Sequence, residues 1–202
     1  MVISLQKGQR ISLEKAGKGL EKICVGVNWG AIEKKGLFGK LKKVGVDLDA
    51  SVGLFSDDKK LIGKVYFGKL ASQCGSIRHS GDDLTGDTEG DDGLDNEVIT
   101  VDLTAVPANV SQLVFVLNSF NGQDFASIPF ASIRVYEGTP SRVDEIVATY
   151  DIANDATFSG KVSMVLGKLY RHADAWKFTS LGDSTEDRKL DATLKTVERK
   201  YL

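Results

Sequence analysis

Apolar and polar residues alternate with a period of two along much of the chain, a pattern typical of strands that bury one face. Turn residues such as Pro107 and Asn121-Gly122 separate these segments. The pattern predicts strands at residues 2–5, 10–13, 23–29, 46–52, 61–67, 98–103, 112–117, 131–136, 146–150, 163–170 and 176–180. The first two flank Gly8 as a small hairpin would. About ten short strands at near-regular spacing indicate an all-β protein, an antiparallel β-sandwich.

The periodicity changes after Asp183, where apolar residues recur at helical spacing. These residues are Leu190, Leu194, Val197 and Tyr201. They predict a C-terminal amphipathic helix with Ser184 or Thr185 as its N-cap. We expect the apolar stripe to pack on the sandwich, and docking to a partner or membrane surface is the alternative. The domain prediction is therefore a sandwich over residues 1–182 followed by a helix over residues 183–202.

Composition narrows the class of protein. A chain of 202 residues with 42% hydrophobic content is long enough for one sizeable core. The net charge of -2 argues against a nucleic-acid partner. Cys24 and Cys74 are too few for a disulfide framework, and their neighbours favour buried free thiols. The sequence predicts no signal peptide and no transmembrane segment, so we expect an intracellular protein.

Five lysines cluster between residues 34 and 43, in a connector that also carries glycines. Such a run is most often a solvated loop. An anionic membrane surface or an acidic partner is the sharper alternative.

The most distinctive segment is an acidic loop between His79 and Val98. From residue 82 to residue 97 it carries eight carboxylates and no Lys or Arg. Two like charges about 5 Å apart repel by roughly 0.8 kcal/mol even in water, and by more in a folded loop. The nearest basic residues in sequence are Arg78 and Arg134, so we expect no side chain near in sequence to neutralise the loop. A divalent cation can neutralise these carboxylates.

The available ligands are hard oxygen donors, which suit calcium better than zinc, and magnesium prefers fewer carboxylates and more water. An EF-hand is excluded. Counting from Asp87 places Asp92 and Val98 where that motif needs Gly and Glu. A solvated acidic loop that binds nothing is the simpler alternative. However, Gly81, Gly86, Gly90 and Gly93 allow sharp turns that could direct oxygen atoms inward.

Asp47 and Asp49 form a second acidic feature. Within one strand they share a face opposite Val46, Leu48 and Ala50. Two carboxylates in this arrangement are either an exposed polar face or half of an oxygen site. Taken alone, the pattern favours the exposed face.

Several segments taken in order resemble the TerD family of tellurite-resistance and stress proteins. They are Ser4-Leu5-Gln6-Lys7-Gly8, Val25-Gly26-Val27-Asn28-Trp29, Asp47-Leu48-Asp49-Ala50-Ser51, His79-Ser80-Gly81-Asp82-Asp83-Leu84-Thr85-Gly86, Ala131-Ser132-Ile133-Arg134, Leu169-Tyr170-Arg171-His172 and Trp176-Lys177-Phe178. The resemblance covers roughly residues 1 to 182. It implies a calcium-binding β-sandwich without known catalysis, associated with resistance to chemical stress.

The resemblance also implies the ligands. Asp47, Asp49, Asp82, Asp83 and Thr85 fall on the family's calcium motif. The rest of the loop is longer here and aligns in two ways, which leaves two further sets open. These are Asp91 with Asp92, or Asp95 and Asn96 with Glu97. The expected cofactor is Ca²⁺, with two ions as the expected number.

The function expected from the resemblance is a non-catalytic stress-response module. Its expected partners are other stress-resistance proteins, within a membrane-associated assembly. Its expected location is the cytoplasm, with peripheral attachment at the inner face of the cytoplasmic membrane. The sequence leaves the oligomeric state open. The alternative is a metal-assisted hydrolase with His79 as its base, but no Ser-His-Asp or Cys-His set accompanies that residue.

Overall fold

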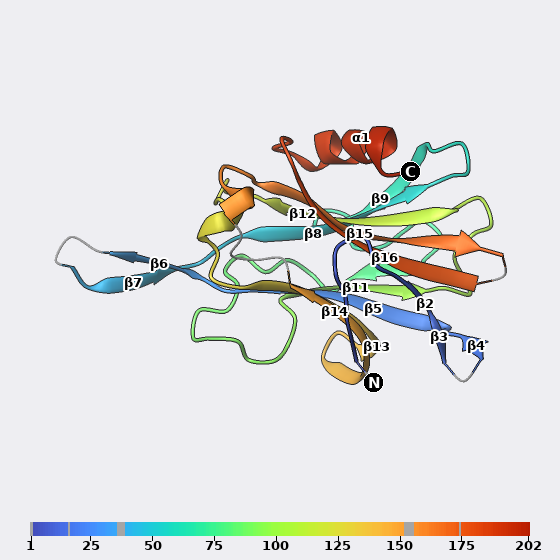
Figure 1. Cartoon of the computed structure of the whole chain (residues 1–202), viewed down its shortest axis with the longest axis horizontal. Helices are drawn as coiled ribbons and strands as arrows, with labels where there is room; N and C mark the ends of the chain where they lie inside the picture. The colour runs from blue at the N-terminus through green and yellow to red at the C-terminus, as the bar shows by residue number, and fades with distance from the viewer. Residues whose placement is uncertain (1, 16, 36–38, 152–155, 174) are drawn as a thin grey trace.

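The computed structural model describes residues 2–15, 17–35, 39–151, 156–173 and 175–202. Two six-stranded sheets lie face to face as a sandwich (Figure 1). Sheet A has the order β1 (Ile3–Ser4), β14 (Arg142–Asp151), β13 (Ala131–Thr139), β5 (Lys22–Trp29), β11 (Glu97–Asp102), β10 (Ile77–His79). Sheet B has the order β2 (Arg10–Ser12), β16 (Ala175–Thr185), β15 (Ser163–His172), β12 (Gln112–Ser119), β8 (Leu48–Phe55), β9 (Leu61–Val65).

The remaining elements are small. Two-stranded ribbons are formed by β3 (Glu14–Lys15) with β4 (Lys18–Gly19) and by β6 (Ile32–Lys35) with β7 (Leu41–Val44). Short 3₁₀ turns are η1 (Phe125–Ser127) and η2 (Ala156–Phe158), and the helix is α1 (Leu190–Lys200). The predicted β-sandwich with a C-terminal helix is confirmed, with more short strands than the pattern predicted. No helix in the described ranges is long and apolar enough to cross a membrane.

Alternating residues of β8 show how the core forms. Leu48, Ala50, Val52 and Leu54 join the main cluster between the two sheets. Phe55 belongs instead to a second cluster on the other face of sheet B, where α1 packs. Asp49 and Ser51 share that outer face with Phe55 because strand side chains alternate. All eight residues of β8 are buried, so the exposed polar face favoured for Asp47 and Asp49 is wrong.

The predicted hairpin around Gly8 is also wrong. Strand β1 pairs in parallel with β14 of sheet A, whereas β2 pairs with β16 of sheet B. The segment between them therefore crosses from one sheet to the other. Local alternation found both strands but could not identify their partners.

The lysine-rich segment at residues 34–43 is not a simple loop. Its described parts form an antiparallel ribbon, with Ile32 opposite Val44 and Lys35 opposite Leu41. Residues 36–38 lie outside the described ranges. The ribbon projects beyond the sandwich as an arm (Figure 1).

The C-terminal helix begins later than predicted. Ser184 and Thr185 belong to β16 and cap nothing, and the N-cap is Lys189, which makes no side-chain capping bond. The predicted apolar stripe does pack on the sandwich. Leu194 and Val197 are fully buried against sheet B, and Leu190 and Tyr201 are partly buried there. Strand β16 runs past the boundary drawn at residue 182.

The two cysteines differ. Both are free, and Cys24 is buried as predicted, but Cys74 is exposed. It lies just before β10, and its sulfur contacts the hydroxyls of Ser72 and Ser76.

We predict that Leu194→Ala lowers the free energy of unfolding by about 2–5 kcal/mol, the usual cost of emptying a packed leucine site. Leu194 is fully buried and packs over Gly53, where an added Cβ would lie 2.8 Å from Leu194 Cδ2. Urea denaturation measures the change. The control is Lys195→Ala at the exposed neighbouring position. If both variants unfold at the parent's midpoint, α1 does not stabilise the sandwich.

Candidate metal centre

The acidic loop lies at the same end of the sandwich as the β6–β7 arm (Figure 1). Its backbone is held by the segment around Trp29. The Asp87 N–H donates to the Trp29 carbonyl at 2.9 Å, and the Ala31 N–H donates to the Asp87 carbonyl at 3.0 Å. The buried Trp29 indole donates to the Val46 carbonyl at 2.8 Å. Trp29 therefore links the acidic loop to the start of β8.

Gly86 allows this close contact between the acidic loop and Trp29. Its φ is +64°, in the left-handed region that glycine adopts most readily. An added Cβ would lie 2.4 Å from two atoms of the Trp29 indole. The loop can approach the tryptophan this closely only with glycine at this position.

The first carboxylate cluster joins Asp47, Asp49 and Asp82. Each offers one oxygen, and the three oxygens lie within 4.8 Å of one another. Calcium–oxygen distances are about 2.3–2.6 Å, so oxygens this close can share one ion. Asp47 and Asp49 are buried, and Asp82 is exposed on the loop. The fold thus brings together the two predicted parts of the site.

One buried carboxylate oxygen of this cluster lacks a hydrogen-bond partner. Asp47 Oδ2 accepts from the Asn121 side-chain amide at 3.2 Å, but the buried Asp47 Oδ1 has no hydrogen-bond partner. Leaving a buried acceptor unpaired costs about 1–3 kcal/mol, and more when it is charged. A cation at the cluster would satisfy this oxygen.

The pKa values of two carboxylates in this cluster, Asp49 and Asp47, are raised. Burial raises the pKa of Asp49 to about 7, and the charges of Glu97 and Asp47 add to the effect. The pKa of Asp47 is raised by burial and then by Asp82. Both pKa values are raised first by burial of the carboxylates and then by the negative charges beside them, two effects that a bound cation would oppose.

A second cluster joins Asp87, Asp91 and Asp92, again with one oxygen from each within 4.8 Å of the others. Asn28 donates to Asp91 Oδ1 at 3.0 Å, while its own buried Oδ1 lacks a partner. Burial raises the pKa of Asp87, although a bond from Asn96 opposes the shift. Asp87 and Asn28 were not among the predicted ligands. Asn28 could have been noticed as a polar residue within the apolar run 23–29.

Asp83, Thr85 and Asn96 organise the loop between the two clusters. Asp83 Oδ1 accepts from the backbone N–H groups of Thr85 and Gly86 at 2.8 and 2.9 Å. Asn96 donates to Asp87 Oδ1 at 2.9 Å and accepts from the Trp29 N–H at 2.7 Å. Neither Asp83 nor Thr85 belongs to a carboxylate cluster, so their predicted role as ligands stays a prediction.

Asp95 is neutralised within the protein by an arginine that lies far from the loop in sequence. Arg134 Nε donates to Asp95 Oδ1 at 2.9 Å, and Arg134 Nη2 donates to the Gly93 carbonyl at 3.0 Å. Burial still raises the pKa of Asp95 despite the arginine. Of the two possible alignments, the structure gathers Asp91 and Asp92 into a cluster and places Asp95 in an ion pair.

Glu97 is completely buried and connects the two sheets. Its Oε2 accepts from the Ala50 N–H at 2.7 Å, and its Oε1 accepts from the Asp83 N–H at 3.2 Å. His79 Nε2 lies 3.3 Å from Glu97 Oε2 and 3.0 Å from the Ala50 carbonyl. Glu97 thus holds β8 and the loop, and its predicted role as a metal ligand stays untested.

His79 is poorly placed as a catalytic base. Its side chain is fully buried, and its Nδ1 accepts from the Gly81 N–H at 3.1 Å. That bond leaves the proton on Nε2, which faces the Ala50 carbonyl. Burial lowers the pKa of His79, but the bond and charge of Glu97 outweigh this and raise it overall. Because both ring nitrogens contact the protein, neither is free to activate water, which argues against the hydrolase alternative.

The fold and this centre define a class of protein: a β-sandwich that gathers carboxylates from a strand and a long acidic loop at one end. The chain belongs to the TerD family, since the TerD domain matches residues 1–196. Stress response protein SCP2 of Bacillus subtilis (strain 168) is 41% identical, over 95% of this chain and 96% of its own length. Tellurium resistance protein TerZ of Serratia marcescens is 38% identical, over 94% of each chain.

A solved structure shares the fold. The crystal structure of a homologue of telluride resistance protein (TerD) from Streptomyces coelicolor A3(2) aligns with a TM-score of 0.63. The alignment covers 87% of this chain and 95% of that one, at 16% identity.

We predict that, in chelator, the melting temperature falls as the pH rises from about 5 to 8. Between the usual Asp pKa of about 3.9 and the folded value of about 7, folded Asp49 holds a proton that the unfolded chain has lost. Stability from that proton is therefore lost as the pH rises. His79 acts in the same direction, because its raised pKa favours folding only while it is protonated.

Thermal melts of Asp49→Asn across this pH range test the assignment. The melting temperature of the variant should fall less steeply with pH than that of the parent, because the substitution removes the carboxyl group whose pKa is raised to about 7. Asp57→Asn, an exposed carboxylate between β8 and β9, is the control and should keep the parent's slope. Equal slopes in parent and Asp49→Asn would contradict the assignment.

Proposed function

We propose that this protein is a calcium-binding, non-catalytic stress-response module that contributes to tellurium and chemical-stress resistance. The observation that carries the proposal is the buried, unpartnered Asp47 Oδ1 beside Asp49 and Asp82. The names of the relatives, stress response protein and tellurium resistance protein, support the biological role.

Calcium fits the ligands better than other divalent ions. Both clusters offer carboxylate oxygens, and neither contains Cys or His. Zinc favours nitrogen and sulfur, while magnesium keeps much of its water and uses one or two carboxylates. Two clusters of three carboxylates support two ions per chain.

Calcium at the first cluster would also couple binding to folding. Asp47 lies directly before β8 of sheet B and Asp49 lies within that strand, whereas Asp82 lies on the acidic loop between two strands of sheet A. An ion held by all three would fasten the loop to the opposite sheet. Because the unfolded chain does not present the three together, binding energy becomes folding energy.

The β6–β7 arm supports an assembly near a membrane. Its lysines Lys34, Lys35, Lys40, Lys42 and Lys43 are all exposed. Basic residues near an anionic bilayer contribute about 1 kcal/mol each. In the proposed function the arm lies against the inner face of the cytoplasmic membrane, where the module meets other stress-resistance proteins.

We predict that calcium raises the melting temperature of chelator-treated protein. A ligand at about 100 times its dissociation constant stabilises by roughly 2.7 kcal/mol when it binds only the folded state. Differential scanning calorimetry with chelator and with millimolar calcium measures the shift, and magnesium at the same concentration is the control. Identical melting temperatures in chelator and in calcium would refute the proposal.

We predict that single substitutions separate the two ions in a calorimetric titration. Asp47→Asn and Asp49→Asn should each weaken one binding event, and Asp91→Asn should weaken the other. Glu89→Gln is the matched control, because it removes one charge from the same loop but lies outside both clusters. If Glu89→Gln weakens binding as much as Asp47→Asn, the loop acts only through its total charge.

A further inference from the structure

A cavity of about 500 Å³ lies on the outer face of sheet B, beside the first turn of α1. Its floor includes Asp49 and Ser51 of β8 and Asn118 of β12. Asp49 marks the end nearest the first carboxylate cluster. The residues on the helix side are Arg188, Lys189, Leu190 and Asp191. Neither the calcium centre nor the packing of α1 accounts for this space.

Two floor residues carry polar atoms without partners. Ser51 and Asn118 are 1% and 5% exposed, and Ser51 Oγ and Asn118 Oδ1 make no hydrogen bond. Buried polar groups are nearly always paired, and a ligand in this cavity would pair with both atoms. Since Asn118 pairs with Asp49 and Ser51 with Val116 across the strands, the two side chains are diagonal neighbours on one face.

Two hydroxyl groups hold the Asn118 amide nitrogen. It donates to the Thr193 hydroxyl at 3.1 Å and to the Ser163 hydroxyl. The amide oxygen Oδ1, which can only accept, is left without a partner. A ligand that pairs with both unpartnered atoms must offer a donor to Asn118 and a matching polar atom to Ser51.

Aromatic rings form one wall. Tyr66 and Phe67 meet edge to face with ring centres 5.4 Å apart, and Phe67 meets Phe120 with centres 5.9 Å apart. All three line the cavity, and Phe120 is 64% exposed. An aromatic side chain this exposed is unusual without a partner, and its face suits a flat ring.

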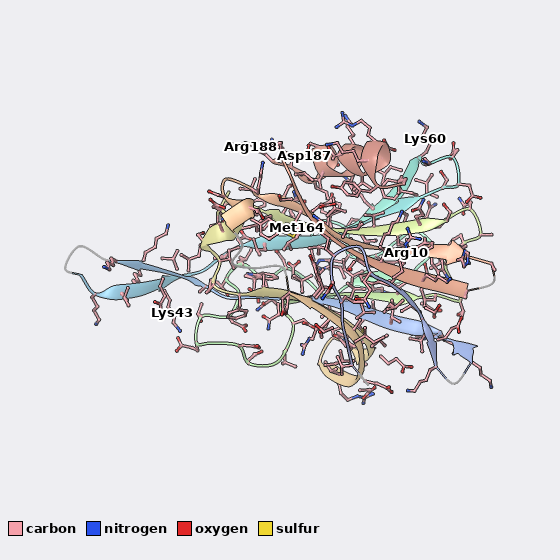
Figure 2. The ribbon with its side chains drawn as sticks, in the orientation of Figure 1. Arg10, Lys43, Lys60, Met164, Asp187 and Arg188 are labelled. Atoms are coloured by element: carbon pink, nitrogen blue, oxygen red, sulfur yellow. The ribbon has the colours of Figure 1, made fainter. Side chains whose placement is uncertain are left out.

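The rim beside α1 is basic. Arg188 and Lys189 are exposed and form no ion pair among the described residues, whereas Lys64 is paired with Asp191. Arg188 lies on the segment that leads into α1 (Figure 2). The N-cap residue provides no side-chain bond to the first turn, so the positive end of the helix adds to these charges. An anionic group is therefore favoured at this end.

We propose that this cavity binds a nucleoside monophosphate. The base would lie against Phe120 with its polar edge on Ser51 and Asn118, and the phosphate would lie at Arg188 and Lys189. The flat base matches the aromatic wall, its polar edge matches Ser51 and Asn118 on the floor, and the anionic phosphate matches the basic rim. The residues that would contact the nucleotide are not those of the proposed calcium centre, although Asp49 of that centre also lines the cavity.

Adenosine monophosphate in isothermal titration calorimetry tests the proposal, with all samples in chelator. Because no calcium is present, the result does not depend on whether the proposed function is correct. We expect saturable binding, and about tenfold weaker binding of adenosine and of inorganic phosphate, since each lacks one part of the match. Guanosine, cytidine and uridine monophosphates complete the panel.

Two exposed residues provide the variants. Arg188→Ala and Phe120→Ala should each weaken binding by about tenfold, the loss of one charge-assisted bond or one stacked base. Lys200→Ala, an exposed cation at the other end of α1, is the control and should bind as the parent does. Melting temperatures matching the parent would confirm that the variants fold.

Three results would overturn the proposal. One is failure of all four nucleotides to bind at millimolar concentration. Another is adenosine binding as tightly as adenosine monophosphate. The third is parental affinity in both Arg188→Ala and Phe120→Ala.

Discussion

Both the sandwich and the candidate metal centre depend on the backbone of Ala50. Strand β9 pairs with β8 only from Val52 onward. The Ala50 N–H donates to the Glu97 carboxylate, and the Ala50 carbonyl accepts from the His79 ring. Glu97 and His79 both belong to strands of sheet A. Two buried side chains of one sheet thus replace the missing strand of the other. The buried negative charge that closes the sandwich here also helps to raise the pKa of Asp49. One arrangement therefore holds the fold together and adds negative charge beside the candidate metal centre.

Much of the sandwich could be predicted because its strands alternate. The segments at residues 46–52 and 112–117 became β8 and β12, close to their predicted bounds. Helical spacing identified the buried stripe of α1 equally well. The pairing of β1 and β2 with different sheets could not be predicted, since two adjacent short strands carry no local signal of distant partners.

The sequence predicted most of the residues that supply the carboxylates of the candidate site, but not which of them converge. Carboxylates without nearby cations predicted a metal site, whereas the shared face of Asp47 and Asp49 alone favoured an exposed polar face, and only the family resemblance predicted these two residues as ligands. The sequence could not show that Arg134 reaches Asp95, because β5 and β13 bring them together only in the folded sheet. Nor could it show that Asp87 joins Asp91 and Asp92, since glycine-rich backbone decides which carboxylates converge.

Asp49 borders both the first carboxylate cluster and the cavity beside α1. Under the proposed function, a divalent ion there would replace uncompensated negative charge at one end of the cavity with positive charge. The ion would then strengthen the attraction that Arg188 and Lys189 provide for an anionic ligand, although the nucleotide and the ion would share no ligand atoms. By linkage, any gain in nucleotide affinity caused by calcium must appear as an equal gain in calcium affinity caused by the nucleotide. The shared wall at Asp49 gives that coupling a direct electrostatic route that needs no change in the fold.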